Sequence, residues 1–194
     1  MPAPDELLGA LDPVVRQVLT ETGALLTGHF QLTSGKHSSV YFQAMKLLQH
    51  PKAAAMPADA ARAHFENVRV DATFAPAVGG IVWGYLLAQR FEGCRALFAE
   101  RVEGEMTLRR NFEIHSGEKI LLAEDVTTTG GSVMELKALA EAAGAEVVGM
   151  ATVLDHHKPE RGDHLIAALL CLAAAAGAVA ASLWFGELPW WLSR

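Results

Sequence analysis

The amino-acid sequence predicts an α/β protein with a central, mainly parallel sheet and helices on both of its faces. Two short runs, Lys119–Ala123 and Val147–Leu154, are almost entirely apolar and flank the helical segment Val133–Ala143. Strands that are apolar on both faces are typical of parallel sheets covered by crossover helices. The same alternation reaches back to residue 70, and the 194 residues suffice for one domain with a sizeable core.

The N-terminal third is expected to contain two helices and a hairpin. Apolar residues at helical spacing predict a helix from Asp12 to about Leu26, with Gly23 as its C-cap. The polar and aromatic stretch 28–43 then predicts strand, turn and strand, with the turn at residues 34–35. Residues 53–68 predict a second helix, with Pro57 in its first turn or at a break.

Three further elements lead into the apolar strands. They are a short strand at Val70–Ala75, a helix at Gly79–Phe91 with two glycines at its mouth, and a strand at Arg95–Glu100. The helix Val133–Ala143 is stopped by Gly144.

Charge and composition exclude several classes of protein. The net charge of −6 and pI of about 5.7 leave no basic field for non-specific nucleic-acid binding. Cys94 and Cys171 are distant in sequence and form no CxxC, which favours free thiols in a reducing compartment. The first six residues carry acids and no basic segment, unlike a secretory signal. We therefore expect a cytoplasmic protein.

The segment from Ile120 to Ser132 carries the chemistry. An apolar strand runs into Glu124 and Asp125, and a loop of threonines and glycines follows before a helix opens. Ser132 and Glu135 have the spacing of a capping box, which predicts the helix start. Glycines and free N–H groups at a helix N-terminus suit a phosphate, whereas carboxylates suit sugar hydroxyls or a hard cation.

Acids on one side of an anion-binding loop fit a phosphorylated sugar. The competing interpretation is a capped helix after a buried strand, with two solvated acids. The loop has neither the lysine of a Walker motif nor the spacing of a dinucleotide fingerprint.

The whole segment resembles the PRPP-binding motif of type I phosphoribosyltransferases. The resemblance covers about residues 14–155 of a single domain spanning 1–194, and it implies the type I fold with a small N-terminal hood. It implies that Glu124 and Asp125 bind the ribose hydroxyls, that Mg²⁺ accompanies PRPP without direct protein ligands, and that the 5-phosphate is held by the loop. The implied loop residues are Val126, Thr127, Thr128, Thr129, Gly130, Gly131 and Ser132.

Two segments resemble the orotate branch of this family. Residues 30–42 are similar to its N-terminal signature, in which an aromatic pair, here Tyr41 and Phe42, packs on the pyrimidine. The alternative is a hairpin with core aromatics. Residues 75–81 resemble the pyrophosphate loop, which implicates Gly79 and Gly80. Many relatives have a lysine at the position of Gly79, so pyrophosphate contacts are expected from backbone N–H groups or other side chains.

A third segment resembles the mobile catalytic loop. Residues 98–101 lead into 102–112, and Arg101 is the best-aligned base for covering pyrophosphate across a homodimer interface. The resemblance thus makes Arg101, Glu124 and Asp125 the catalytic candidates. Arg109 and Arg110 could supply charge from a differently shaped loop, or could be a solvated pair.

The resemblance implies transfer of the phosphoribosyl group from PRPP to orotate, in pyrimidine biosynthesis. Thr128 and His156 stand where the family contacts orotate, and His156 replaces the usual arginine, which would pair with the orotate carboxylate. That replacement leaves open a phosphoribosyltransferase for another base. The catalytic loop lacks its usual Lys and His, which leaves open a PRPP-binding regulator without catalysis.

The similarity stops at His156, and residues 156–194 form an atypical apolar tail. Leu165–Phe185 is uncharged over 21 residues, long enough to span a membrane, with tryptophans following it. Its alanine and glycine content favours a buried element of a soluble domain instead. A frame-shifted C-terminus is the third interpretation.

Overall fold

The computed structural model describes residues 13–31, 37–127 and 129–155, and these form a five-stranded sheet with helices and an N-terminal hairpin. The sheet has the order β5-β4-β3-β6-β7, in which β5 is antiparallel to β4 and all other neighbours are parallel. The predicted α/β architecture is therefore confirmed. The strands are β3 (Ala72–Pro76), β4 (Arg95–Val102), β5 (Glu105–Leu108), β6 (Lys119–Thr127) and β7 (Glu146–Asp155).

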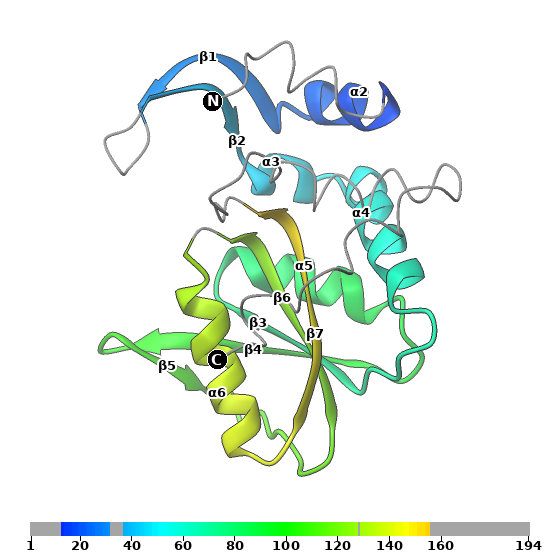
Figure 1. Ribbon diagram of the computed structural model, residues 1–194, viewed down its shortest axis with the longest axis vertical. Coiled ribbons are helices and arrows are strands. Elements are labelled where there is room, and N and C mark those ends of the chain that lie inside the picture. The colour runs from blue at the N-terminus through cyan, green and yellow to red at the C-terminus, as the bar shows by residue number, and fades with distance from the viewer. Residues whose placement is uncertain (1–12, 32–36, 128, 156–194) are drawn as a thin grey trace, which may run out of the picture.

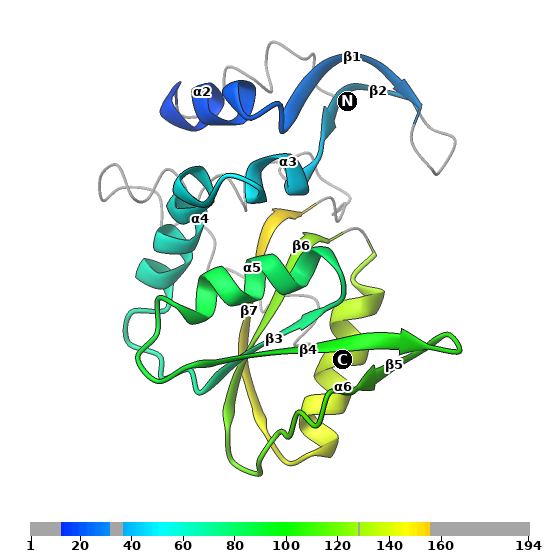
Figure 2. The ribbon, with the colours of Figure 1, turned by 180° about the vertical axis from the view of Figure 1, so that it is seen from behind.

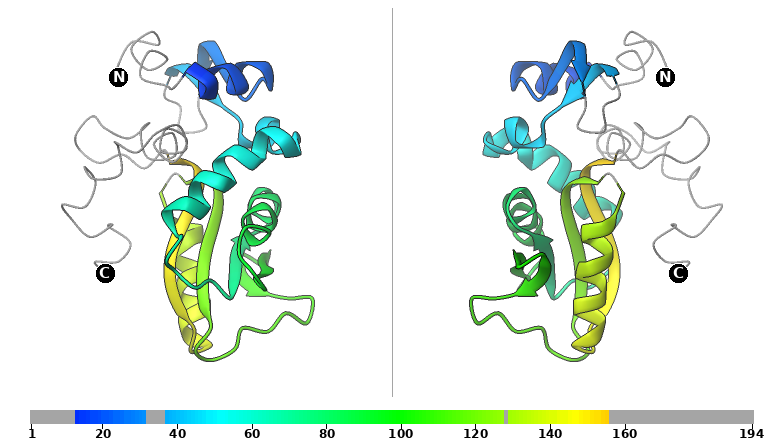
Figure 3. Two further views of the ribbon diagram at one scale, coloured as in Figure 1. Left: turned by 90° about the vertical axis from the view of Figure 1, so that its right-hand side faces the viewer. Right: turned by 90° about the vertical axis from the view of Figure 1, so that its left-hand side faces the viewer.

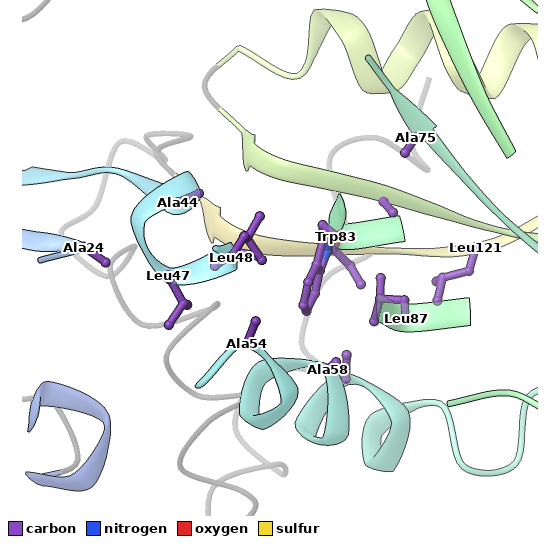
Figure 4. Packing of buried hydrophobic residues seen from close by; sticks show 14 of the residues in the cluster. Ala24, Ala44, Leu47, Leu48, Ala54, Ala58, Ala75, Trp83, Leu87 and Leu121 are labelled. Carbon is purple, nitrogen blue, oxygen red and sulfur yellow. Dashed lines mark hydrogen bonds between the residues drawn. The ribbon is translucent and has the colours of Figure 1, made fainter. Parts of the chain in front are cut away.

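Helices cover both faces of the sheet. Helix α6 (Gly131–Ala142) lies in front of the sheet in Figure 1, and α5 (Gly79–Ala88) lies in front of it when the molecule is seen from behind in Figure 2. Each helix packs on its own cluster of apolar side chains. On the α5 face the fully buried Trp83 donates its indole N–H to the carbonyl of Ala151 at 2.9 Å (Figure 4 shows the packing around it).

The N-terminal elements form a hood beyond the carboxyl ends of β6 and β7, which run toward it in Figures 1 and 2. The hood contains α2 (Pro13–Glu21), β1 (Leu25–Gln31) and β2 (His37–Phe42), with β1 and β2 antiparallel. Helices α3 (Ala44–Leu48) and α4 (Pro51–His64) connect it to the sheet, and Figure 3 shows α4 running down from the hood.

The first predicted helix was too long. It ends at Glu21, and Gly23 adopts φ +66°, so the predicted C-cap is confirmed. Leu25 and Leu26 belong to β1 instead, where they pair with Phe42 and Tyr41. Their helical spacing was misleading because the pairing of a strand with distant residues leaves no signal in the local sequence.

The second predicted helix was displaced and its proline misplaced. Sequence reasoning missed α3, and α4 begins at Pro51, where the missing N–H costs nothing. Pro57 lies well inside α4 and is buried, and the helix continues through it. Packing of its ring in the core offsets the lost backbone hydrogen bond.

The segment expected to be a mobile loop is a β-hairpin. Strands β4 and β5 pair from Ala99↔Leu108 to Val102↔Glu105. The two residues between them, Glu103 and Gly104, both have positive φ, which is the signature of a type I′ turn. The β4–β5 hairpin extends sideways past α6 (Figures 1 and 2).

None of the helices in the described part of the chain combines the length and hydropathy needed to span a membrane. The apolar stretch 165–185 lies outside the described residues.

Candidate active site

The start of helix α5 meets strand β6 at the carboxyl edge of the sheet, where β3 and β6 are neighbours. Helix α5 follows β3 and begins at Gly79, and β6 carries Asp125 on the same side of the sheet. A Cβ atom placed on Gly79 would lie 2.2 Å from Oδ2 of Asp125. The carboxylate therefore occupies the space that any side chain at position 79 would need, and it brings the two elements together in one site.

The sequence suggested that the two acids follow the strand, but in the structure they lie within β6. The strand extends through Thr127, and Glu124 pairs in register with Thr152 of β7. Consecutive residues of a strand point to opposite faces, so Asp125 lies beside α5 and Glu124 points to the α6 face. Glu124 is 9% exposed, whereas Asp125 is half-buried.

Burial, followed by the adjacent charge and side-chain hydrogen bond of Asp125, raises the pKa of Glu124 to about 8. Glu124 is therefore largely protonated near neutral pH. A carboxylic acid can donate a hydrogen bond to a sugar oxygen, while the carboxylate beside it accepts one.

This elevated pKa predicts a pH-dependent stability. The folded state retains the proton between the ordinary value of 4.5 and about 8, whereas the unfolded state has lost it. The free energy of unfolding should therefore fall as pH rises through this window, by roughly 2 kcal/mol or more in total. Glu124→Gln, which mimics the protonated acid, should remove that part of the decline in urea denaturation at about pH 5 and about pH 9. The exposed Glu141→Gln is the control, and parallel profiles for wild type and Glu124→Gln would contradict the prediction.

The N-terminus of α6 is open toward the site. Gly130 is the N-cap residue with φ +75°, and no side chain caps the helix. The predicted capping box of Ser132 and Glu135 is therefore wrong. Helix α6 begins at Gly131, so Ser132 lies inside its first turn and not at the N-cap. The uncapped N–H groups suit a phosphate.

The threonines of the loop differ in what they contact. Thr127 is 2% exposed, and its hydroxyl lies 3.3 Å from that of Thr152. Thr129 is exposed, and a Cβ on Gly131 would meet its hydroxyl at 3.7 Å. Thr128 lies outside the described residues, as does His156.

Arg101 is held by an ion pair that the sequence did not suggest. Its guanidinium donates to Glu135 at 2.7 and 3.0 Å and to the carbonyl of Gly104 at 2.7 Å. Arg109 and Arg110 both pair with Glu100, at 3.5 and 2.8 Å, and their side chains remain exposed to solvent. The fixed spacing of a hairpin creates these pairs, and no sequence motif announces them.

The aromatic pair of the hood is divided between surface and core. Tyr41 is 38% exposed and its ring lies 5.5 Å from that of Phe30. Phe42 packs against the apolar cluster on the α5 face. Of the two, Tyr41 is therefore the side chain that a ligand can reach without disturbing the core.

The chemistry of these groups fits a magnesium ion delivered with its substrate. Glu124 and Asp125 offer hard oxygen ligands, and Mg²⁺ is commonly bound by one or two carboxylates together with substrate phosphates. Within the described segments there is no cluster of three or more metal-ligating side chains.

An acid pair, an uncapped helix N-terminus and a glycine loop on one sheet edge define a protein that binds a phosphorylated sugar. A family model described as "Phosphoribosyl transferase domain" matches residues 43–167, and the chain belongs to this family, with its type I fold.

Within the family, the chain belongs to the orotate phosphoribosyltransferases. It is 47% identical over 143 residues to that enzyme of Chlorobium phaeobacteroides, covering 74% of each chain. It is 49% identical over 144 residues to that of Wolinella succinogenes, covering 72% of this chain and 68% of the relative. The crystal structure of orotate phosphoribosyltransferase from Aeropyrum pernix has a TM-score of 0.62 at 25% identity, covering 72% of this chain and 80% of that one.

Proposed function

We propose that this protein transfers the 5-phosphoribosyl group of PRPP to orotate, giving orotidine 5'-phosphate and pyrophosphate in pyrimidine biosynthesis. The observation that carries the proposal is the meeting of Asp125, Gly79 and the uncapped α6 N-terminus on one sheet edge. Family membership supplies the choice of base, since the curated relatives bear the name of the orotate enzyme.

Each group takes a role that suits its chemistry. Glu124 and Asp125 hold the two ribose hydroxyls, and the N–H groups from Val126 to Ser132 hold the 5-phosphate. The backbone at Gly79 and Gly80, at the start of α5, approaches the pyrophosphate, and Arg101 supplies positive charge. Orotate is placed by the hood, with Tyr41 as the exposed ring; Phe42, Thr128 and His156 complete the proposed set.

The reaction needs no nucleophile from the protein. A ring nitrogen of orotate attacks the anomeric carbon with inversion, the bond to the pyrophosphate oxygen breaks, and the electron pair leaves with pyrophosphate. The proton of that ring nitrogen passes to the departing pyrophosphate or to water. Glu124 and Asp125 hold the sugar in the orientation that the attack requires, and carboxyl oxygens beside it favour a sugar that becomes cationic. Mg²⁺, when bound with PRPP, neutralises the leaving group.

We further propose a cytoplasmic homodimer in which Arg101 serves the site of the second copy. The support is geometric: within its own chain Arg101 contacts α6, while Asp125 faces the α5 side of the sheet. A guanidinium on the α6 face therefore lies on the opposite face of the sheet from Asp125 of its own chain.

The proposal is tested by following the loss of orotate absorbance with PRPP and Mg²⁺. We expect turnover that stops when EDTA removes the metal and that is absent with adenine, guanine or uracil. Turnover with another base, and none with orotate, would make the protein a phosphoribosyltransferase for that base. PRPP binding without turnover on any base would replace the enzyme with a binding protein.

A further inference from the structure

The ion pair between β4 and α6 uses the guanidinium of Arg101 in a particular way. Nη1 and Nη2 donate to the two carboxylate oxygens of Glu135, at 3.0 and 2.7 Å. The other Nη1 proton goes to the carbonyl of Gly104, at 2.7 Å, within the turn of its own hairpin. The end-on edge of the guanidinium is thus fully engaged.

The other edge of the same group remains open. An arginine has five N–H donors, and the three contacts leave the Nε proton and one Nη2 proton. Those two protons point the same way and match the spacing of two oxygens of a phosphate. Among the described residues, no acceptor takes them. The Arg101 side chain is 47% exposed, so an anion can approach this edge.

We propose that Glu135 is a positioning residue that presents the side-on edge of Arg101 to the diphosphate of PRPP, an inference that rests on the proposed function. The carboxylate of Glu135 also accepts a hydrogen bond from the backbone N–H of Met106 in β5, which holds it beside the hairpin. A free arginine would have to give up rotamer freedom each time it met the diphosphate. Glu135 and the Gly104 carbonyl restrict that freedom in advance.

The test compares Glu135→Gln, Arg101→Ala and the double variant in steady-state kinetics. We expect Glu135→Gln to lower kcat/KM for PRPP on the order of tenfold, because orientation is lost while the charge of Arg101 remains. The KM for orotate should not change. In the Arg101→Ala background, Glu135→Gln should have no further effect, since Glu135 acts only through Arg101.

Glu141→Gln is the matched control. It removes another exposed carboxylate of the same helix, paired with Lys137 at 3.7 Å, and should leave the kinetics unchanged. Thermal melts should coincide for all variants, because the pair is exposed. An unchanged kcat/KM in Glu135→Gln, or an effect that persists without Arg101, would overturn the inference.

A second readout separates this inference from the proposed function. Calorimetric binding of inorganic pyrophosphate with Mg²⁺ does not require turnover. Weaker binding by Glu135→Gln but not Glu141→Gln would support the role of Glu135 even if orotate were not the substrate. Equal binding by all three proteins would count against that role, whatever the enzyme assay gave.

Discussion

Asp125→Asn should reduce phosphoribosyl transfer to orotate by at least about 10²-fold, the usual cost of removing one electrostatic group from a catalytic site. The carboxylate is half-buried and lies against Gly79, so an amide of the same size fits without repacking. The lost charge is the one closest to the sugar in our proposal. The measurement is kcat with saturating PRPP, orotate and Mg²⁺.

Asp59→Asn is the matched control, because Asp59 pairs with Arg90 on the surface of α4 and its side chain is 63% exposed. It should retain wild-type turnover. Retention of activity by Asp125→Asn would remove Asp125 from the proposed site.

The Asp125→Asn variant also tests the proposed dimer. Coexpressed with Arg101→Ala, it should regain about a quarter of wild-type activity if Arg101 acts across the interface. The reason is that half of random dimers are mixed, and each mixed dimer contains one complete site out of two.

Gly79→Ala should lower kcat by roughly ten- to a hundredfold while changing the free energy of unfolding by less than about 1 kcal/mol. The added Cβ would lie 2.2 Å from Oδ2 and 2.6 Å from Cγ of Asp125, so the carboxylate must rotate away. Only a short side chain moves, and alanine suits the first residue of α5 better than glycine does. Kinetics and urea denaturation measure the two effects.

Gly80→Ala provides the contrast within the same loop. Its Cβ would lie 2.7 Å from Cδ of Pro76 and 3.3 Å from the carbonyl oxygen of Ala123, groups that cannot rotate away. This variant should lose about 1–3 kcal/mol of stability through overpacking. If Gly79→Ala were destabilised equally, or remained fully active, the proposed contact with Asp125 would be wrong.

The central strands of the sheet could be predicted from the sequence more accurately than the boundaries of the N-terminal elements. The apolar runs at 119–123 and 147–154 marked β6 and β7, because burial on both faces leaves a composition that few other structures require. The boundary at Leu25 failed because strand pairing in the hood is a long-range property. The short helix α3 carries only five residues, too few for a periodic signal.

The site was predictable in its residue types and not in its contacts. Glu124 and Asp125 stood out because they join an apolar strand to a loop of threonines and glycines at the start of a helix. The contact between Gly79 and Asp125 joins residues 46 positions apart through the pairing of β3 with β6, and it has no local pattern. Glu135 was mistaken for a capping residue, because its spacing from Ser132 did not show that the helix begins earlier, at Gly131.

The extension of β6 through both acids affects how the site moves. From Glu124 to Thr127 the backbone is paired with β7, so these residues belong to the sheet. Their amide hydrogens should exchange with solvent as slowly as those of the core, whereas the loop at Thr129 exchanges by local opening. The ribose-binding geometry is then lost only when part of the sheet opens. A destabilising substitution far from the site would therefore increase the fraction of molecules in which the site is open.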